Sequence, residues 1–309
     1  MDTFEQATPT QAEEAEILLE LTPALVQKRR SQGRIAFDRF VRNRMAILGA
    51  VFLILLFIFC FLGPIITGHT HPDDVEATQP FSAPTLQFPF GADDVGRDSF
   101  ARAMVGGQIS LLVGISSMLA AILLGIGIGS LAGYFGGIID NLLMRTTDTI
   151  LAIPLYLLLF VLSASFTNGT PASIIILIAI FGWTTSARLI RGEFLAQKER
   201  EYVKAAQTIG AQHFRLMFRH ILPNALGPII VNATLLVGSN IILESVLSYF
   251  GFGIKIPVAS WGSMVSDAQG FGNFRLIFIP GILIFLTVLS CNLVGDGLRD
   301  ALDPHMTER

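Results

Sequence analysis

Uncharged apolar runs separated by short polar segments dominate the sequence from residue 46 onward. A helix needs about 20 apolar residues to cross a bilayer, and several runs reach that length. The run at 149–187 is interrupted by the turn-forming sequence TNGTP, so it is interpreted as two spans. The pattern predicts an all-α polytopic membrane protein with about six transmembrane helices, at 46–66, 109–134, 147–166, 172–190, 225–243 and 276–295.

The composition agrees with this prediction. Hydrophobic residues make up 52% of the 309 residues and charged residues only 15%, and the mean hydropathy is +0.61. A soluble domain with so little charge would not stay dispersed. Both cysteines, Cys60 and Cys291, lie in apolar runs without His or Cys neighbours at metal-ligand spacing, so neither a disulfide framework nor a metal site is predicted there.

Basic residues divide unequally between the two sides that six spans define. Arg97, Arg102, Lys255 and Arg275 fall on one side, and the other 17 of the 21 basic residues fall on the side of both termini. Because Lys and Arg concentrate in cytoplasmic loops, both termini are predicted to be cytoplasmic.

The polar segments give the domain organisation. Residues 1–27 carry six acids, and the basic segment that follows is expected to lie on the anionic inner leaflet. The expected parts are a cytoplasmic N-terminal segment (1–45), the first transmembrane helix (46–66), an external loop (67–105), a permease core of five transmembrane helices (106–298) and a cytoplasmic tail (299–309). The core contains a cytoplasmic loop (191–223) and an external loop (248–275), with a short re-entrant helix predicted at SWGSMVSDAQ.

A charged, helix-forming segment at 201–225 stands between two of the apolar runs. Gly210 divides it and Pro223 ends it. Apolar residues recur at helical spacing on both sides of the glycine; they are Tyr202, Ala205, Ala206, Ile209, Phe214, Met217, Phe218 and Ile221. The spacing predicts two amphipathic helices forming a compact knob, in which the small residues allow another backbone to approach. Docking of a partner and an ordinary loop lying on the membrane both remain open on this pattern.

This segment resembles the EAA loop of ABC-importer permeases, through Lys204-Ala205-Ala206, Gly210 and Leu222-Pro223. Lys204 replaces the acid of that motif, and His220 stands at its usual isoleucine. Further motifs resemble the dipeptide/oligopeptide/nickel group of these permeases, in the expected order between residues 28 and 304; they are FGADDVGRDSFAR, GSLAGYFGGIIDNLLMR, RHILPN, LSYFGFGIKIPVASWG and GDGLRDALDP. The chain is similar to the second, C-type permease subunit of a dipeptide or oligopeptide importer.

The resemblance implies a type I importer permease fold in a bacterial cytoplasmic (inner) membrane. It implies transport of di- or oligopeptides by alternating access, with a second homologous permease, two cytoplasmic ATPase subunits and an extracytoplasmic substrate-binding protein as partners. The loop would couple to the ATPases through Glu201, Tyr202, Lys204, Ala205, Ala206, Gly210, Phe214, Arg215, Phe218, Arg219, Leu222 and Pro223.

No lysine follows a glycine, so the chain has no G-x-x-x-x-G-K phosphate loop. No catalytic triad, zinc motif or dinucleotide loop is visible either, so the chain is not expected to be an enzyme or to hold a cofactor, and ATP and Mg²⁺ would be bound by the partner subunits. Nucleic-acid binding is not expected, because the membrane explains the basic stretch at 28–44 better. Importers of nickel chelates or glutathione-like compounds remain alternatives. An ion-gradient-driven carrier would need paired midplane charges and symmetric broken helices, neither of which is visible. A passive channel subunit would need no cytoplasmic knob.

Several residues within or beside the spans are further candidates. Gly125, Gly129 and Gly133 recur every four residues and predict close helix packing, with Gly137 expected near the helix end. Glu244, together with Ser248, has either a pathway or gate role or a plain structural pairing near the outer interface.

Some charged residues suggest local interactions. Asp148 is expected to pair with Arg145 on its own helix. His69 and His71 belong to the sequence HTHPDD, which is more typical of a solvated loop than of a metal site. Contact with the binding protein is expected of the external residues Asp93, Asp94, Arg97, Asp98 and Trp261.

Overall fold

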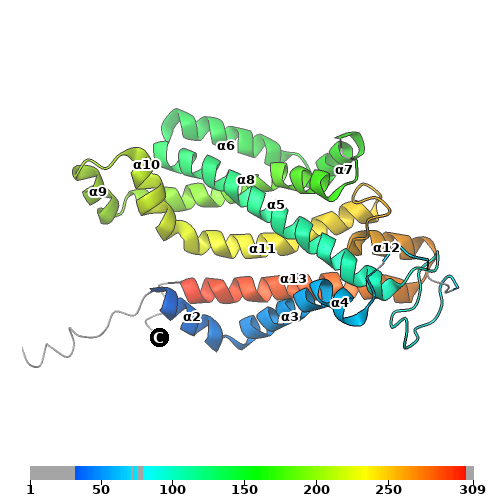
Figure 1. Ribbon diagram of the computed structural model, residues 1–309. Coiled ribbons are helices and arrows are strands. Elements are labelled where there is room, and N and C mark those ends of the chain that lie inside the picture. Colours follow the sequence, from blue (N-terminus) through cyan, green and yellow to red (C-terminus); the bar gives the residue numbers. More distant parts are fainter. Residues whose placement is uncertain (1–31, 71, 76–78, 167, 304–309) are drawn as a thin grey trace, which may run out of the picture.

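The computed structural model describes residues 32–303 apart from 71, 76–78 and 167. The predicted acidic tail at 1–27 therefore lies outside the described residues. The described part is helical, and its only extended pairing is an isolated bridge between Ala92 and Asp98. The helices, shown in Figure 1, are α2 (Gln32–Arg42), α3 (Arg44–Phe61), α4 (Gly63–Thr67), α5 (Ser99–Phe135), α6 (Gly137–Ala152), α7 (Leu155–Phe166), α8 (Pro171–Lys198), α9 (Glu201–Thr208), α10 (His213–Arg215), the π-helical turn η1 (Leu216–Ile221), α11 (Leu222–Tyr249), α12 (Trp261–Gly270) and α13 (Phe274–Leu302).

Local sequence explains where the main helices begin. The Asn43 side chain accepts hydrogen bonds from the main-chain N–H groups of Met45 and Ala46 at the start of α3. Asp98 caps α5 in the same way. Ser260 and Ser263 form a capping box at α12, which confirms the short helix predicted in the second external loop.

Most of the predicted spans are confirmed. Five described helices are long and apolar enough to cross a membrane, or six if α6 and α7 together make one span. The 37 residues of α5 rise about 55 Å, more than the hydrocarbon core of about 30 Å, so α5 extends beyond the bilayer. The loop before it consequently ends at residue 98, earlier than predicted.

The span predicted at 147–166 is not one continuous helix. α6 and α7 meet at a bend of 85°. Ile153 is extended, with ψ of 131°, because it precedes Pro154, and the proline has no N–H to continue the helix.

A close pair of helices, α5 and α8, forms the centre of one layer, with α11 beside it, and α3 packs on α13 in the other layer (Figure 1). Gly125, Gly129 and Gly133 provide the contact: a Cβ atom at these positions would lie 2.8 Å from Ser186 Cβ, 2.5 Å from the carbonyl oxygen of Ala187 and 2.7 Å from that of Arg191, respectively. The close helix packing predicted from these glycines therefore occurs within this chain, between α5 and α8. Gly137 takes no part, since it begins α6 with a φ of +56° and open space around it.

Both described ends of the chain lie at the same end of the bundle as α9 and α10 (Figure 1). Arg39 Nη1 donates to the carbonyl oxygen of Asp303 at 3.0 Å, and Asn43 Nδ2 donates to Asp300 Oδ2 at 3.3 Å. These bonds join α2 to the end of α13. The long loop before α5, together with α7 and α12, lies at the opposite end.

Candidate functional site

A helical hairpin, defined here as residues 199–223, projects from one end of the bundle (Figure 1). It consists of α9, a turn at Gly210, α10 and η1. Gly210 has a φ of +83°, a left-handed conformation that favours glycine, and its missing side chain would point into open space. The predicted helix–turn–helix is confirmed, although α8 continues to Lys198, so the hairpin begins later than the loop predicted at 191–223.

The inner side of the hairpin is a buried apolar core. Val203, Leu216, Met217 and Ile221 are each no more than 1% exposed, and Ala206 is 7% exposed. They pack with side chains from the ends of α5 and α8, namely Tyr134, Ile190 and Phe194. The hairpin is therefore attached firmly to these two helices.

The predicted apolar stripes are wrong in their composition. Met217 and Ile221 point inward, whereas Phe214 and Phe218 are 70% and 45% exposed. The turn at η1 is π-helical, so the angular spacing of a regular α-helix does not apply to these residues. Ala206 was expected to admit a partner backbone, but its burial removes it from the accessible surface.

The outward side is an exposed apolar face, formed by Tyr202, Ala205, Ile209, Phe214 and Phe218. Ile209 is 86% exposed, and the stacked rings of Phe214 and Phe218 have centroids 5.9 Å apart. Charged and polar residues surround this face; those predicted for the loop are Glu201, Lys204, Arg215 and Arg219, all exposed. Lys204 Nζ lies 3.1 Å from Glu199 Oε2, in the hairpin itself.

Sequence reasoning missed a polar contact that joins the hairpin to the bundle. Tyr134 Oη lies 2.8 Å from His213 Nδ1, and Lys198 Nζ donates to the carbonyl oxygen of Tyr134 at 2.7 Å. The Lys198 ammonium also lies 5.6 Å from the centre of the Tyr134 ring. These three residues come from α5, α8 and α10, so no spacing within one segment could have revealed the contact.

Ion pairs join α6 to α8 nearby. Asp148 pairs with Arg188 at 2.6 Å, so the predicted pair of Asp148 with Arg145 is wrong. Arg191 also donates through two nitrogens to both carboxylate oxygens of Asp140, a bidentate contact. The packing of α6 along α8 brings these groups together across a long stretch of sequence.

Glu244 on α11 is fully buried near the opposite end of the bundle. Its carboxylate accepts hydrogen bonds from Ser110 Oγ at 3.1 Å and Ser248 Oγ at 2.7 Å. Those serines in turn accept from the main-chain N–H groups of Trp261 and Ile254. Glu244 therefore lies inside the protein and not at an exposed interface, and it holds the segment before α12 against α5 and α11. A pathway or gate role of Glu244 and Ser248 stays a prediction.

This geometry predicts the effect of two substitutions at Glu244. Glu244→Gln keeps the size and a carbonyl acceptor, so we expect nearly unchanged thermal stability and transport. Glu244→Ala leaves a cavity and two serine hydroxyls without their acceptor, so we expect a loss of about 2–4 kcal/mol in the free energy of unfolding. Thermal unfolding and substrate uptake measured on both variants check this. Normal stability with abolished transport in Glu244→Gln would instead support a gate.

The charged residues before α5 form a compact internal network. Asp93, Arg97 and Asp98 are less than 10% exposed, and Arg97 Nε donates to Asp93 Oδ2 at 2.7 Å. Asp98 also contacts His69 Nδ1. Trp261 is fully buried, with its indole N–H donating to the carbonyl oxygen of Ala103. Their contact with a binding protein stays a prediction; among the pairs of this network, the side chain of Asp94 is more exposed than those of Asp93 and Arg97.

No group of three or more potential metal ligands is found among the described residues. His71 lies outside them. Cys60 and Cys291 are free and buried.

Comparison with known proteins places the chain among membrane transport subunits. Residues 125–308 match the family model for the binding-protein-dependent transport system inner membrane component, and residues 31–87 match that for the N-terminal TM domain of oligopeptide transport permease C. The oligopeptide transport system permease protein OppC of Bacillus subtilis (strain 168) is 39% identical over 285 residues, which cover 91% of this chain and 92% of that protein.

Two further relatives have similar coverage. The dipeptide transport system permease protein DppC of Bacillus subtilis (strain 168) is 38% identical over 88% of this chain and 85% of its own length. The glutathione transport system permease protein GsiD of Pectobacterium atrosepticum is 35% identical over 90% of this chain and 92% of its own.

Proposed function

Because the chain belongs to the family of binding-protein-dependent transport system inner membrane components, a family of ABC-importer permease subunits, we propose that it carries di- or oligopeptides across a bacterial cytoplasmic membrane. The peptide substrate is supported by the names of the oligopeptide and dipeptide permeases that it resembles. A glutathione-like substrate is the second candidate, supported by the similarity to the glutathione permease. Competition of labelled peptide uptake by glutathione separates the two.

The observation that carries the mechanism is the exposed apolar face of the hairpin. Outside the membrane, a protein surface seldom exposes several large apolar side chains together unless a partner covers them. A short helical hairpin can supply such side chains to a groove on another protein. The distribution of basic residues supports a cytoplasmic position for the hairpin and for both termini. The proposed occupant of this face is a cytoplasmic ATPase subunit.

The way in which the hairpin is attached suggests how motion enters the membrane. Its inner core and the contacts of Tyr134 and Lys198 join it to α5 and α8. Those two helices pack backbone against backbone through Gly129 and its neighbours. A push on the hairpin would therefore move α5 and α8 together, and the translocation pathway would alternate between its two openings.

The remaining partners follow from the same proposal. The chain has no phosphate-binding loop, so ATP hydrolysis would belong to a pair of ATPase subunits and the chain itself would be non-catalytic. A second, homologous permease would complete the pathway, and an extracytoplasmic binding protein would deliver the peptide.

A cysteine crosslink tests this function. We expect Ile209→Cys, in a chain with Cys60 and Cys291 replaced by alanine, to crosslink to a co-expressed ATPase subunit, with a yield that changes when ATP is added. Ile65→Cys is the matched control: Ile65 is 74% exposed but belongs to α4, which lies far from α9 and α10 in Figure 1, so it should not crosslink. Absence of a crosslink at Ile209, with uptake that persists after inactivation of the ATPase, would support an ion-driven carrier instead.

A further inference from the structure

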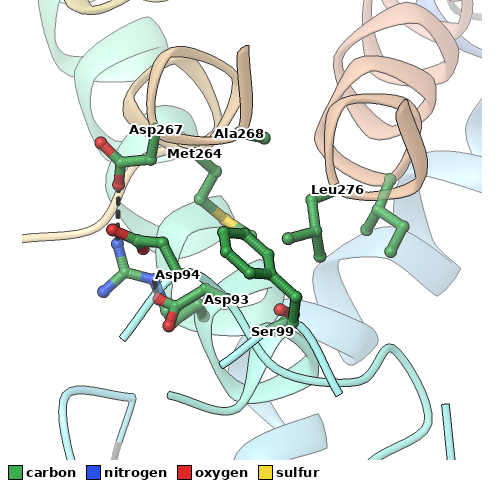
Figure 2. A pocket seen from close by; sticks show the side chains of 10 residues that line it. Asp93, Asp94, Ser99, Met264, Asp267, Ala268 and Leu276 are labelled. Atoms are coloured by element: carbon green, nitrogen blue, oxygen red, sulfur yellow. Dashed lines mark hydrogen bonds and ion pairs between the residues drawn. The ribbon is translucent and has the colours of Figure 1, made fainter. Parts of the chain in front are cut away.

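A small hollow opens beside the first turn of α5, between α12 and the start of α13 (Figure 2). It lies at the end of the bundle opposite the hairpin. One of its walls is polar, with Asp94, Ser99, Arg102 and Asp267. The other wall is apolar, as described below.

Two polar atoms in the polar wall have no hydrogen-bond partner. Ser99 is 1% exposed, yet its Oγ has no partner among the described residues. Asp94 Oδ1 is equally without one, and its nearest cation, Arg97 Nη2, is 3.6 Å away. Buried polar atoms normally find partners. Both of these oxygen atoms can accept a hydrogen bond, so they suit a ligand that carries hydrogen-bond donors.

The charge around the hollow favours a cation. Four carboxylates, of Asp73, Asp93, Asp94 and Asp267, surround two guanidinium groups, of Arg97 and Arg102. The contact of Arg102 Nη2 with Asp267 is loose, at 3.4 Å. Burial raises the pKa of the Asp267 carboxyl, Arg102 opposes this shift, and the neighbouring Asp94 adds to it. The carboxylates of this cluster outnumber its guanidinium groups, which favours the binding of a further positive charge.

The apolar wall decides what kind of cation fits. Phe81, Met264 and Leu276 line it, and Met264 and Leu276 are less than 10% exposed. A hydrated metal ion gains nothing from such a wall. A lysine side chain buries its methylene stem along apolar surface while its ammonium reaches polar partners, and the three N–H groups of the ammonium match several acceptors.

We propose that this hollow receives the ammonium end of a lysine side chain of the extracytoplasmic binding protein when that protein docks. The inference rests on the proposed function, since a binding-protein-dependent importer must receive a protein at its outer face. Asp94 Oδ1 and Ser99 Oγ accept from the ammonium, and the apolar wall contacts the stem. The site explains why a buried serine and an aspartate remain without partners beside an open hollow.

A small-molecule probe tests the hollow without the binding protein. The probe is Nα-acetyl-lysine amide, added to the purified full-length chain in lipid nanodiscs and followed by saturation-transfer NMR, with the neutral Nα-acetyl-norleucine amide as its matched analogue. We expect the lysine probe alone to bind, and the double variant Asp94→Asn, Ser99→Ala to bind it about tenfold more weakly. Asp74→Asn, an exposed acid outside the hollow, should leave binding unchanged.

Stability provides the control on folding. Ser99→Ala removes a hydroxyl that has no partner, so the thermal stability of the variant should not fall. Equal binding of both probes, or equal binding of the lysine probe by wild type and the double variant, would overturn the proposal.

A docking measurement identifies the source of the ammonium. We expect the affinity of the assembled importer for its binding protein to fall about tenfold in the double variant, and acetylation of the binding protein's lysines to lower wild-type affinity to the same level. If docking is unchanged and only uptake of peptides with a free amino terminus is impaired, the occupant is the peptide and the assignment to a lysine is overturned. If no binding protein docks on the wild-type importer, the proposed function itself fails, whatever the lysine probe does.

Discussion

Replacing Gly129 by leucine is expected to separate α5 from α8 and to remove most of the folded protein. A Cβ atom at this position would lie 2.5 Å from the carbonyl oxygen of Ala187 and 3.1 Å from its Cα. Both are backbone atoms of α8, so no side-chain rotation relieves the clash, and the helices must move apart. We expect a loss of about 3 kcal/mol or more in the free energy of unfolding. Size-exclusion chromatography of the detergent extract and thermal unfolding measure this loss.

Gly127 provides the matched control two residues earlier on the same helix. It is exposed, and no atom lies within 4 Å of the position of its Cβ, so Gly127→Leu should accumulate and unfold like wild type. Both variants add the same apolar side chain to the same span, so a difference in membrane insertion cannot explain the result. Equal stability of the two variants would show that α5 and α8 do not pack as closely as the structure has them.

Features that depend on local sequence were predictable. Apolar runs of spanning length identify α3, α5, α8, α11 and α13, because the length of a membrane helix is fixed by the bilayer. The hairpin was predicted from its charge, its helical spacing and Gly210, all of which lie within one segment. The glycine spacing indicated a close helix contact but not its partner, since nothing in α5 points to α8.

Features that depend on distant contacts were not predictable. Asp93, Arg97 and Trp261 were expected to face a partner because polar and amphipathic residues in external loops are normally exposed. Trp261 is buried because its partner comes from another helix: its indole N–H donates to the carbonyl oxygen of Ala103. Asp93 and Arg97 are buried because they pair with each other inside the loop. Asp148 likewise pairs with Arg188 because α6 folds back along α8 after α5, which no local spacing encodes.

The bend at Pro154 and the π-helical turn at η1 could be predicted only in part. The proline was visible in the sequence, but a proline within an apolar run is compatible with a kinked helix as well as with a break. The π-helical turn has no proline or glycine within it, and it changes which of Met217 and Phe218 points inward. As a result, the sequence predicted an amphipathic hairpin correctly but assigned some of its residues to the wrong side.

Removing the exposed apolar face of the hairpin is expected to have the second large effect, a loss of ATPase binding. Changing both Phe214 and Phe218 to aspartate is expected to abolish ATP-driven uptake and to weaken binding of the ATPase subunit by at least about 30-fold, because even one buried aromatic anchor at an interface contributes about 2 kcal/mol or more. Folding should be retained, because the two rings are exposed and stack on each other rather than in the core. Copurification of the ATPase, its affinity for the permease and the uptake of labelled peptide measure the three effects.

The control must place a negative charge on the same hairpin without removing the aromatic face. Gln212→Asp does this, because Gln212 is exposed at the N-cap of α10, where aspartate is favourable. This variant should keep ATPase binding and most of the uptake. The comparison separates the loss of apolar contact from a general effect of negative charge at this end of the bundle. Normal ATPase binding and uptake in the double aspartate variant would mean that energy reaches α5 and α8 by a route other than this face of the hairpin.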